Sequence, residues 1–137
     1  MDKIYNMEIS EILMLERLIF GSSSGLSGII GAVGTRLDRK RSLSGLEEKG
    51  LISIDDGSII VCDSMNDFIS HLSMAKYMVH TDDDMTVIYY CPQEIIVMKK
   101  QDNSQKSCLI HRFPSIPKLE DFLEKEQLTK VSVRNLI

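Results

Sequence analysis

Apolar residues recur at helical spacing along residues 9–20, and Gly21 follows directly. This spacing places the apolar side chains on one face of a helix. A glycine after a helix commonly closes it, because glycine adopts the left-handed backbone conformation without strain. We therefore predict a helix over 9–20 that ends at Gly21. Its apolar face consists of Ile9, Ile12, Leu13, Ile19 and Phe20.

Residues 21–34 contain five of the eight glycines, and Gly25, Gly28, Gly31 and Gly34 are spaced by three. Glycine at this density disfavours a free-standing helix. The same spacing would clear one side of a short helix for a neighbouring backbone. We predict a loop that leads into a short, tightly packed second helix.

A third helix is predicted from Thr35 to Lys49. Thr35 and Asp38 have the spacing of a capping box, in which both side chains satisfy free amides at a helix start. Leu43 and Leu46 would face inward, and Gly50 would end the helix.

A hairpin follows. Residues 52–54 and 59–61 are rich in isoleucine and valine, and 55–58 read Asp-Asp-Gly-Ser, which is a tight-turn signal.

Residues 64–67 form a second possible capping box, and the pattern predicts a helix over 64–79 that ends before the acidic residues 82–84. The apolar face of this helix would hold Met65, Phe68, Leu72, Ala75 and Val79.

Three strands are predicted next, over 86–91, 94–99 and 107–112, joined by turns at 92–93 and 101–106. The middle strand is apolar at successive positions, as expected when a strand is covered on both faces. A helix over 117–126 should then direct Leu119, Phe122 and Leu123 inward, with Pro117 in its first turn. Residues 131–137 alternate apolar and polar residues, which fits either a last strand or a frayed end.

The order of elements predicts one α+β domain over 1–137. Residues 1–62 have the pattern of a winged helix-turn-helix. Residues 63–130 would form a helix, a three-stranded antiparallel meander and a C-terminal helix, and 131–137 would form a tail.

Composition and charge narrow the classes of function. With 137 residues, 43% of them hydrophobic, the chain can bury a core, and its net charge of −4 gives no general attraction to phosphate backbones or anionic membranes. Three cysteines without a CxxC pair indicate reduced cytosolic thiols. Charged residues interrupt the most apolar stretch, so we expect no membrane insertion, no signal peptide and a cytoplasmic protein.

The candidate catalytic and metal-binding motifs favour structural interpretations. Residues 21–25 match the GxSxG pattern but follow a helix, whereas a nucleophile elbow needs a strand there. Cys108 and His111 should point to opposite faces of their strand and cannot easily share a metal ion. A Cys91–His111 pair across adjacent strands stays open, although strand thiols are more often structural. We expect no enzyme activity, no cofactor and no metal.

The basic cluster at the start of the third predicted helix supports two interpretations. In a winged helix this is the recognition helix, so Arg36, Arg39, Lys40 and Arg41 could contact DNA phosphates. The acidic residues 47–48 and 55–56 oppose this, because a DNA backbone would often pass there. The second interpretation is a winged helix kept as a structural or protein-binding scaffold.

The chain also resembles one half of the EspG-type chaperones of type VII secretion and their single-domain relatives in Gram-positive bacteria. The resemblance rests on the helix 9–15 with its Phe20-Gly21 end, on Leu46–Ile52, on strands near 95–98 and 109–112, and on the helix 117–126. It implies a cytosolic adaptor that binds a small helical secreted protein and keeps it soluble until export. The chain is half as long as the two-lobed chaperones of this type.

The leading hypothesis is therefore a non-enzymatic protein-binding adaptor or chaperone, which receives a helix or strand at a sheet edge or in a groove. The candidate binding residues are Tyr89, Tyr90, Val97, Ile110, Val131, Val133 and Ile137. The alternative is a winged-helix DNA-binding regulator, the only case in which nucleic acid would be a partner. A homodimer, including a dimerising ligand sensor with the helix 64–79 at its interface, also stays open.

Overall fold

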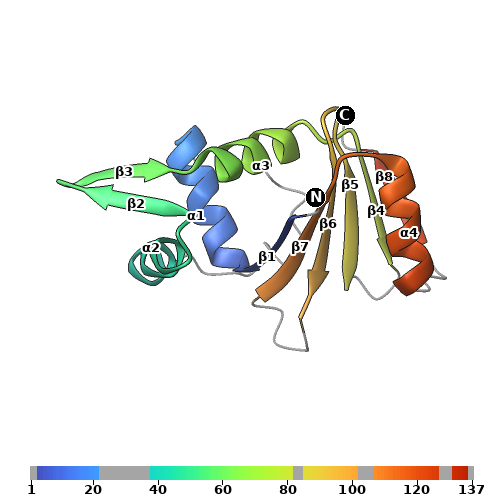
Figure 1. Cartoon of the computed structure of the whole chain (residues 1–137), viewed down its shortest axis with the longest axis horizontal. Helices are drawn as coiled ribbons and strands as arrows, with labels where there is room; N and C mark the ends of the chain where they lie inside the picture. Colours follow the sequence, from blue (N-terminus) through green and yellow to red (C-terminus); the bar gives the residue numbers. More distant parts are fainter. Residues whose placement is uncertain (1–2, 22–37, 82–84, 102–106, 127–130, 136–137) are drawn as a thin grey trace.

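The computed structural model describes residues 3–21, 38–81, 85–101, 107–126 and 131–135. Within these residues the chain is α+β, as predicted (Figure 1). The helices are α1 (Ile9–Phe20), α2 (Arg39–Glu48), α3 (Asp63–Ser73) and α4 (Ile116–Glu126). The strands are β1 (Lys3–Glu8), β2 (Ile52–Asp55), β3 (Ser58–Val61), β4 (Tyr77–Thr81), β5 (Thr86–Tyr90), β6 (Ile95–Lys100), β7 (Ser107–Phe113) and β8 (Val131–Asn135).

Six of the described strands form one antiparallel sheet in the order β1-β7-β6-β5-β4-β8, and β2 and β3 form a separate hairpin. The predicted meander β5-β6-β7 lies in the middle of the sheet. One end of the sheet is marked by a row of paired residues, in which Tyr77 lies opposite Tyr90, Tyr90 opposite Ile95, and Ile95 opposite Phe113.

The sheet is covered on both faces. Helices α1 and α3 lie on one side of it and α4 on the other, while α2 and the hairpin extend from the α1 side, far from α4 (Figure 1). Successive residues of a strand face opposite sides. In β6, Ile96 and Met98 therefore pack in the core under α1 and α3, whereas Ile95 and Val97 pack with Leu119 of α4. The expectation of a central strand apolar on both faces is confirmed.

Helix α1 has the predicted bounds, and Gly21 closes it with φ 81°, where its amide donates to the Arg17 carbonyl. The predicted second helix at 21–34 lies outside the described residues. Helix α2 begins later than predicted: Asp38 caps it by accepting a hydrogen bond from the Arg41 amide at 3.1 Å. Thr35 lies outside the described residues.

The hairpin is confirmed. Asp56 and Gly57 connect β2 to β3 with φ of 49° and 79°. Positive φ at both central residues defines the type I′ turn, whose twist matches that of paired strands.

The helix predicted over 64–79 is shorter in the structure. Helix α3 ends at Ser73 and starts after Cys62, so the expected cap at Ser64 is wrong. Ala75 falls in the connection, and Val79 lies in β4, paired with Ile88 of β5. Apolar residues at 75 and 79 fit a helical face, but they equally fit a connection followed by a half-buried strand. Strand β1 was not predicted either.

The C-terminal elements follow the prediction with small shifts. Helix α4 starts at Ile116, one residue before Pro117, and buries Leu119 fully while Phe122 and Leu123 pack at its margin. Of the two alternatives for the tail, residues 131–135 form strand β8, antiparallel to β4. Among the described helices, none is long and apolar enough to cross a membrane.

Candidate functional site

Three of the apolar residues proposed as a binding surface belong to the core instead. Tyr89, Val97 and Ile110 are at most 2% exposed. They lie on the central strands β5, β6 and β7, where helices cover both faces of the sheet. Their inclusion in a surface is therefore wrong, because a partner could reach them only by unpacking the core.

Tyr90, by contrast, lies beside exposed apolar side chains at one end of the sheet. It lies half-buried at one end of the sheet, and its ring meets that of Tyr77 edge-on with centroids 6.4 Å apart. Burial raises the pKa of the Tyr90 hydroxyl. Tyr77 is 49% exposed, and Met74, three residues before it, is 52% exposed. The Gln93 amide donates to the Met74 sulfur at 3.4 Å and ties the β5–β6 turn to this place.

Ile116 adds a further exposed apolar side chain at the same end of the sheet. It opens α4 three residues after Phe113, which belongs to the same row of paired residues as Tyr77 and Tyr90. We call Met74, Tyr77, Tyr90 and Ile116 the tyrosine end of the sheet. It holds three of the six large apolar side chains that are exposed among the described residues, namely Met74, Tyr77 and Ile116.

Strand β8 borders the tyrosine end. Val131 and Val133 pair with Thr81 and Val79 of β4, and Asn135 pairs with Tyr77. Within the described residues, no strand pairs with the other side of β8, so the strand presents a free backbone edge. Ile137, the last candidate, lies outside the described residues.

The basic cluster lies at the start of α2. Arg39, Lys40 and Arg41 are exposed, and Arg36 lies outside the described residues. The Arg41 guanidinium donates to the Glu8 carboxylate at 2.7 Å. Part of the cluster is thus neutralised by the junction between β1 and α1.

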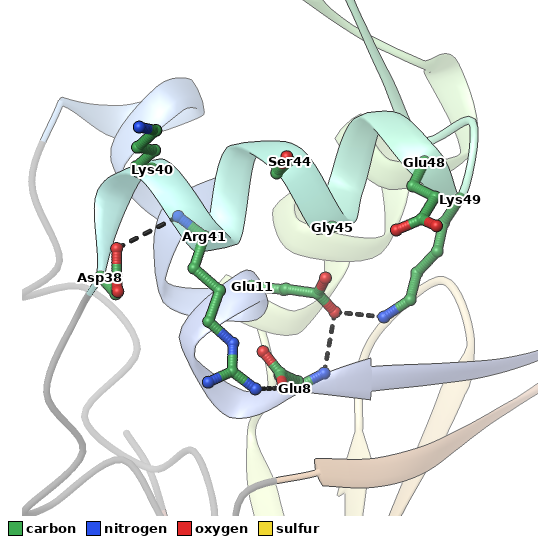
Figure 2. A pocket seen from close by; sticks show the side chains of 9 residues that line it. All are labelled: Glu8, Glu11, Asp38, Lys40, Arg41, Ser44, Gly45, Glu48 and Lys49. Carbon is green, nitrogen blue, oxygen red and sulfur yellow. Dashed lines mark hydrogen bonds and ion pairs between the residues drawn. The ribbon is translucent and has the colours of Figure 1, made fainter.

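A hollow of about 600 Å³ lies between this junction and α2 (Figure 2). One of the groups that line it is Glu11, which is 2% exposed. Glu11 Oε1 accepts from Lys49 Nζ at 2.5 Å and from the Glu8 amide at 2.9 Å. Gly45 faces the same carboxylate, and a Cβ at position 45 would overlap Glu11 Oε2. The glycine in the middle of α2 is therefore required by the close approach of Glu11.

The hollow carries both signs of charge. It is lined by Glu8, Glu11, Asp38, Lys40, Arg41, Ser44, Gly45, Glu48 and Lys49. Four carboxylates thus stand against three cations. The lining of this hollow therefore lacks the excess of positive charge that phosphate binding needs.

A second polar cluster joins α3 to the sheet. Arg112 donates to both oxygens of Glu94, at 2.7 and 2.5 Å, and to the Ser64 carbonyl at 2.9 Å. His71 Nδ1 lies 2.6 Å from Glu94 Oε2. Burial alone would raise the pKa of Glu94, but the hydrogen bonds from Arg112 and His71 outweigh it and lower this pKa. Arg112, through the Ser64 carbonyl, and Glu94, through His71, thus connect the sheet to α3 by hydrogen bonds.

The cysteine chemistry left open by the sequence is not supported. Cys91 packs against the core under α1 and α3, whereas the His111 ring lies 4.9 Å from Phe122 of α4, on the opposite face. The structure therefore does not bring Cys91 and His111 together, and this open alternative is not supported. Cys108 is on the α1 side as well, so its separation from His111 is as predicted. Burial raises the pKa of Cys91 and Cys108 to about 12, which opposes thiolate formation. Among the described residues, no group of three or more His, Cys, Asp or Glu could hold a metal ion.

The tyrosine end was missed because the sequence pattern extended a helix through residue 79. Had Tyr77 been placed in a strand, its exposure beside Tyr90 could have been predicted from the β-rich pattern 77–81. The dimer interface considered on the helix 64–79 could not use the apolar face of α3, because this face is buried in the core. The face consists of Met65, Phe68, Ile69 and Leu72.

No family model, no curated protein and no solved structure matches this chain.

Proposed function

We propose that this chain is a non-enzymatic protein-binding adaptor or chaperone, and that it takes up an extended segment of a partner along the free edge of β8. The observation that carries this proposal is the position of that edge beside the tyrosine end. Unpaired backbone groups of an edge strand can hydrogen-bond a further strand, and apolar side chains nearby supply affinity and selectivity.

The electrostatics support a protein partner. The net charge is −4 and the hollow at α2 has more carboxylates than cations. The raised pKa of two of the three thiols gives no support to nucleophilic catalysis. The resemblance to EspG-type chaperones adds a candidate client, a small helical secreted protein of type VII secretion that would be kept soluble until export.

One observation favours a second candidate function. Arg39 and Lys40 are exposed on α2, which occupies the place of the recognition helix before the hairpin. A winged-helix regulator would bind duplex DNA through them and Arg41, with an affinity that falls steeply with salt, and charge reversal at Arg39 and Arg41 would abolish binding.

The test compares two surface substitutions in a capture experiment. Tyr77→Glu places a charge at the tyrosine end, whereas Ile60→Glu is a matched control on the hairpin, where Ile60 is 59% exposed. The tagged chain should recover a protein from its native host after nuclease treatment. We expect Tyr77→Glu to lower that recovery by about tenfold, as for loss of a central aromatic contact, and Ile60→Glu to leave it unchanged.

Both variants should keep the circular dichroism spectrum and melting temperature of the parent, since both side chains are at the surface. Equal recovery by both variants would contradict the location of the site. Recovery of DNA alone, lost as salt is raised, would favour the winged-helix regulator.

A further inference from the structure

The charged side chains within α2 are arranged against its dipole, whereas the two residues that cap the helix, Asp38 and Lys49, have the favourable sign. Arg39, Lys40 and Arg41 occupy the first turn, and Glu47 and Glu48 occupy the last. The amino end of a helix carries partial positive charge and the carboxyl end partial negative charge. Each group of side chains therefore stands next to charge of its own sign. This arrangement costs the isolated helix stability, and such local conflicts are expected where a surface serves a partner.

The outward face of α2 shows which residues a partner would meet. Ser42 and Leu46 are fully buried on the opposite side of the helix. Lys40, Ser44 and Glu48 are exposed at intervals of four residues and form a row along the helix. In Figure 2 the Lys40 and Ser44 side chains point away from Glu11, whereas the Glu48 carboxylate turns toward the side of Lys49. All three line the hollow of Figure 2. Among the described residues, neither Lys40 nor Glu48 has an ion-pair partner.

We propose that this row is a homodimer interface, in which α2 packs antiparallel to α2 of a second copy about a twofold axis at Ser44. An axis at Ser44 places Lys40 of one protomer opposite Glu48 of the partner subunit, and symmetry forms the same pair a second time. Each pair lies about 6 Å along the helix from the axis, at 1.5 Å per residue.

The centre of the row suits a close approach of two helices. Ser44, at the centre of the row, has a small side chain, and α2 lies at the end of the molecule far from α4 (Figure 1). The described residues thus leave room for a second copy. A nucleic acid would meet Glu47 and Glu48 in the same helix, and phosphates would be repelled there. The self-complementary charge pattern makes a second copy the better occupant.

The test reverses the charges of the proposed Lys40–Glu48 pairs one at a time and together. In the K40E variant and in the E48K variant, each dimer would bring like charges together at both ends of the interface. We expect each variant alone to weaken dimerisation by about tenfold or more in sedimentation equilibrium, since charges of one sign are then opposed. An equimolar mixture of the two variants should restore a dimer of wild-type strength. A dimer of one K40E protomer and one E48K protomer has opposite charges in both pairs. The double variant K40E/E48K should also dimerise.

The mixture excludes a folding defect as the cause, because misfolded single variants would not recover on mixing. Wild-type dimerisation should weaken as salt is raised. A wild-type chain that stays monomeric at every concentration would overturn the proposal. So would a dimer whose dissociation constant neither single variant changes, or a mixture that dimerises no more tightly than either variant alone. The tyrosine end is untouched by these variants, so the result is independent of the proposed adaptor function.

Discussion

At the scale of single residues, the contact between Gly45 and Glu11 explains a local conflict in the sequence. Glycine within a helix costs about 1 kcal/mol relative to alanine, yet α2 has glycine where its interior faces the buried Glu11 carboxylate. The carboxylate is fixed by Lys49 and by the Glu8 amide, and it cannot withdraw without losing these hydrogen bonds. The glycine therefore serves the packing of α2 on α1.

This contact predicts an unusual response to substitution. Gly45→Ala should lower the free energy of unfolding by about 2 kcal/mol, because a displaced Glu11 leaves a buried charge poorly paired. Urea denaturation measures the change. In a Glu11→Ala background the same substitution should be neutral or gain up to about 1 kcal/mol from helix propensity. An equal loss in both backgrounds would show that Glu11 is not the cause.

The two thiols with raised pKa predict low reactivity in the folded chain. In a Cys62→Ala variant only Cys91 and Cys108 remain. With their pKa near 12, neither should react measurably with a disulfide reagent at pH 8, and both should react after denaturation. Rapid labelling of either thiol in the folded state would contradict the raised pKa of these two cysteines.

The same shift has a consequence for stability. A pKa raised on folding means that the protonated thiol is favoured in the folded state. The contribution of each protonated thiol to the free energy of unfolding is complete below the ordinary pKa of 9.0. This contribution is lost as the pH rises toward 12.

At the scale of elements, the sequence predicted those whose pattern matches only one structure. Helix α1 was predictable from its long apolar face and Gly21, and the hairpin from Asp56 and Gly57. Strand β4 was not, because apolar residues at 75 and 79 fit a helix as well as a strand. Strand β1 became part of the sheet only by pairing with β7, about a hundred residues later, and its own sequence contains no sign of that contact.

The location of the candidate surfaces was harder to predict than the elements. The local sequence around Tyr89, Val97 and Ile110 fits a solvent-facing strand as well as one covered by a helix. Only the order of strands in the sheet shows that these residues are central. The tyrosine end depends on a row of residues drawn from β4, β5, β6 and β7. The charge pattern of α2, by contrast, was visible in the sequence, although its outward row needed the buried side of the helix to be known.

At the scale of the whole molecule, the two proposed surfaces lie at opposite ends. Helix α2 is at one end and the edge strand β8 lies at the far side of the sheet (Figure 1). A twofold dimer through α2 would leave both β8 edges free. The assembly would then offer two partner sites per dimer, and each could be filled without disturbing the other.

We propose that this chain binds a protein and not DNA, and the decisive measurement is capture from the native host under nuclease treatment and increasing salt. We expect a bound protein that stays attached after nuclease treatment and in moderate salt, because backbone pairing and apolar contacts do not depend on counterions. Capture that disappears with nuclease, or DNA that is released as salt rises, would contradict the proposed protein partner. It would instead favour α2 as the recognition helix of a winged-helix regulator.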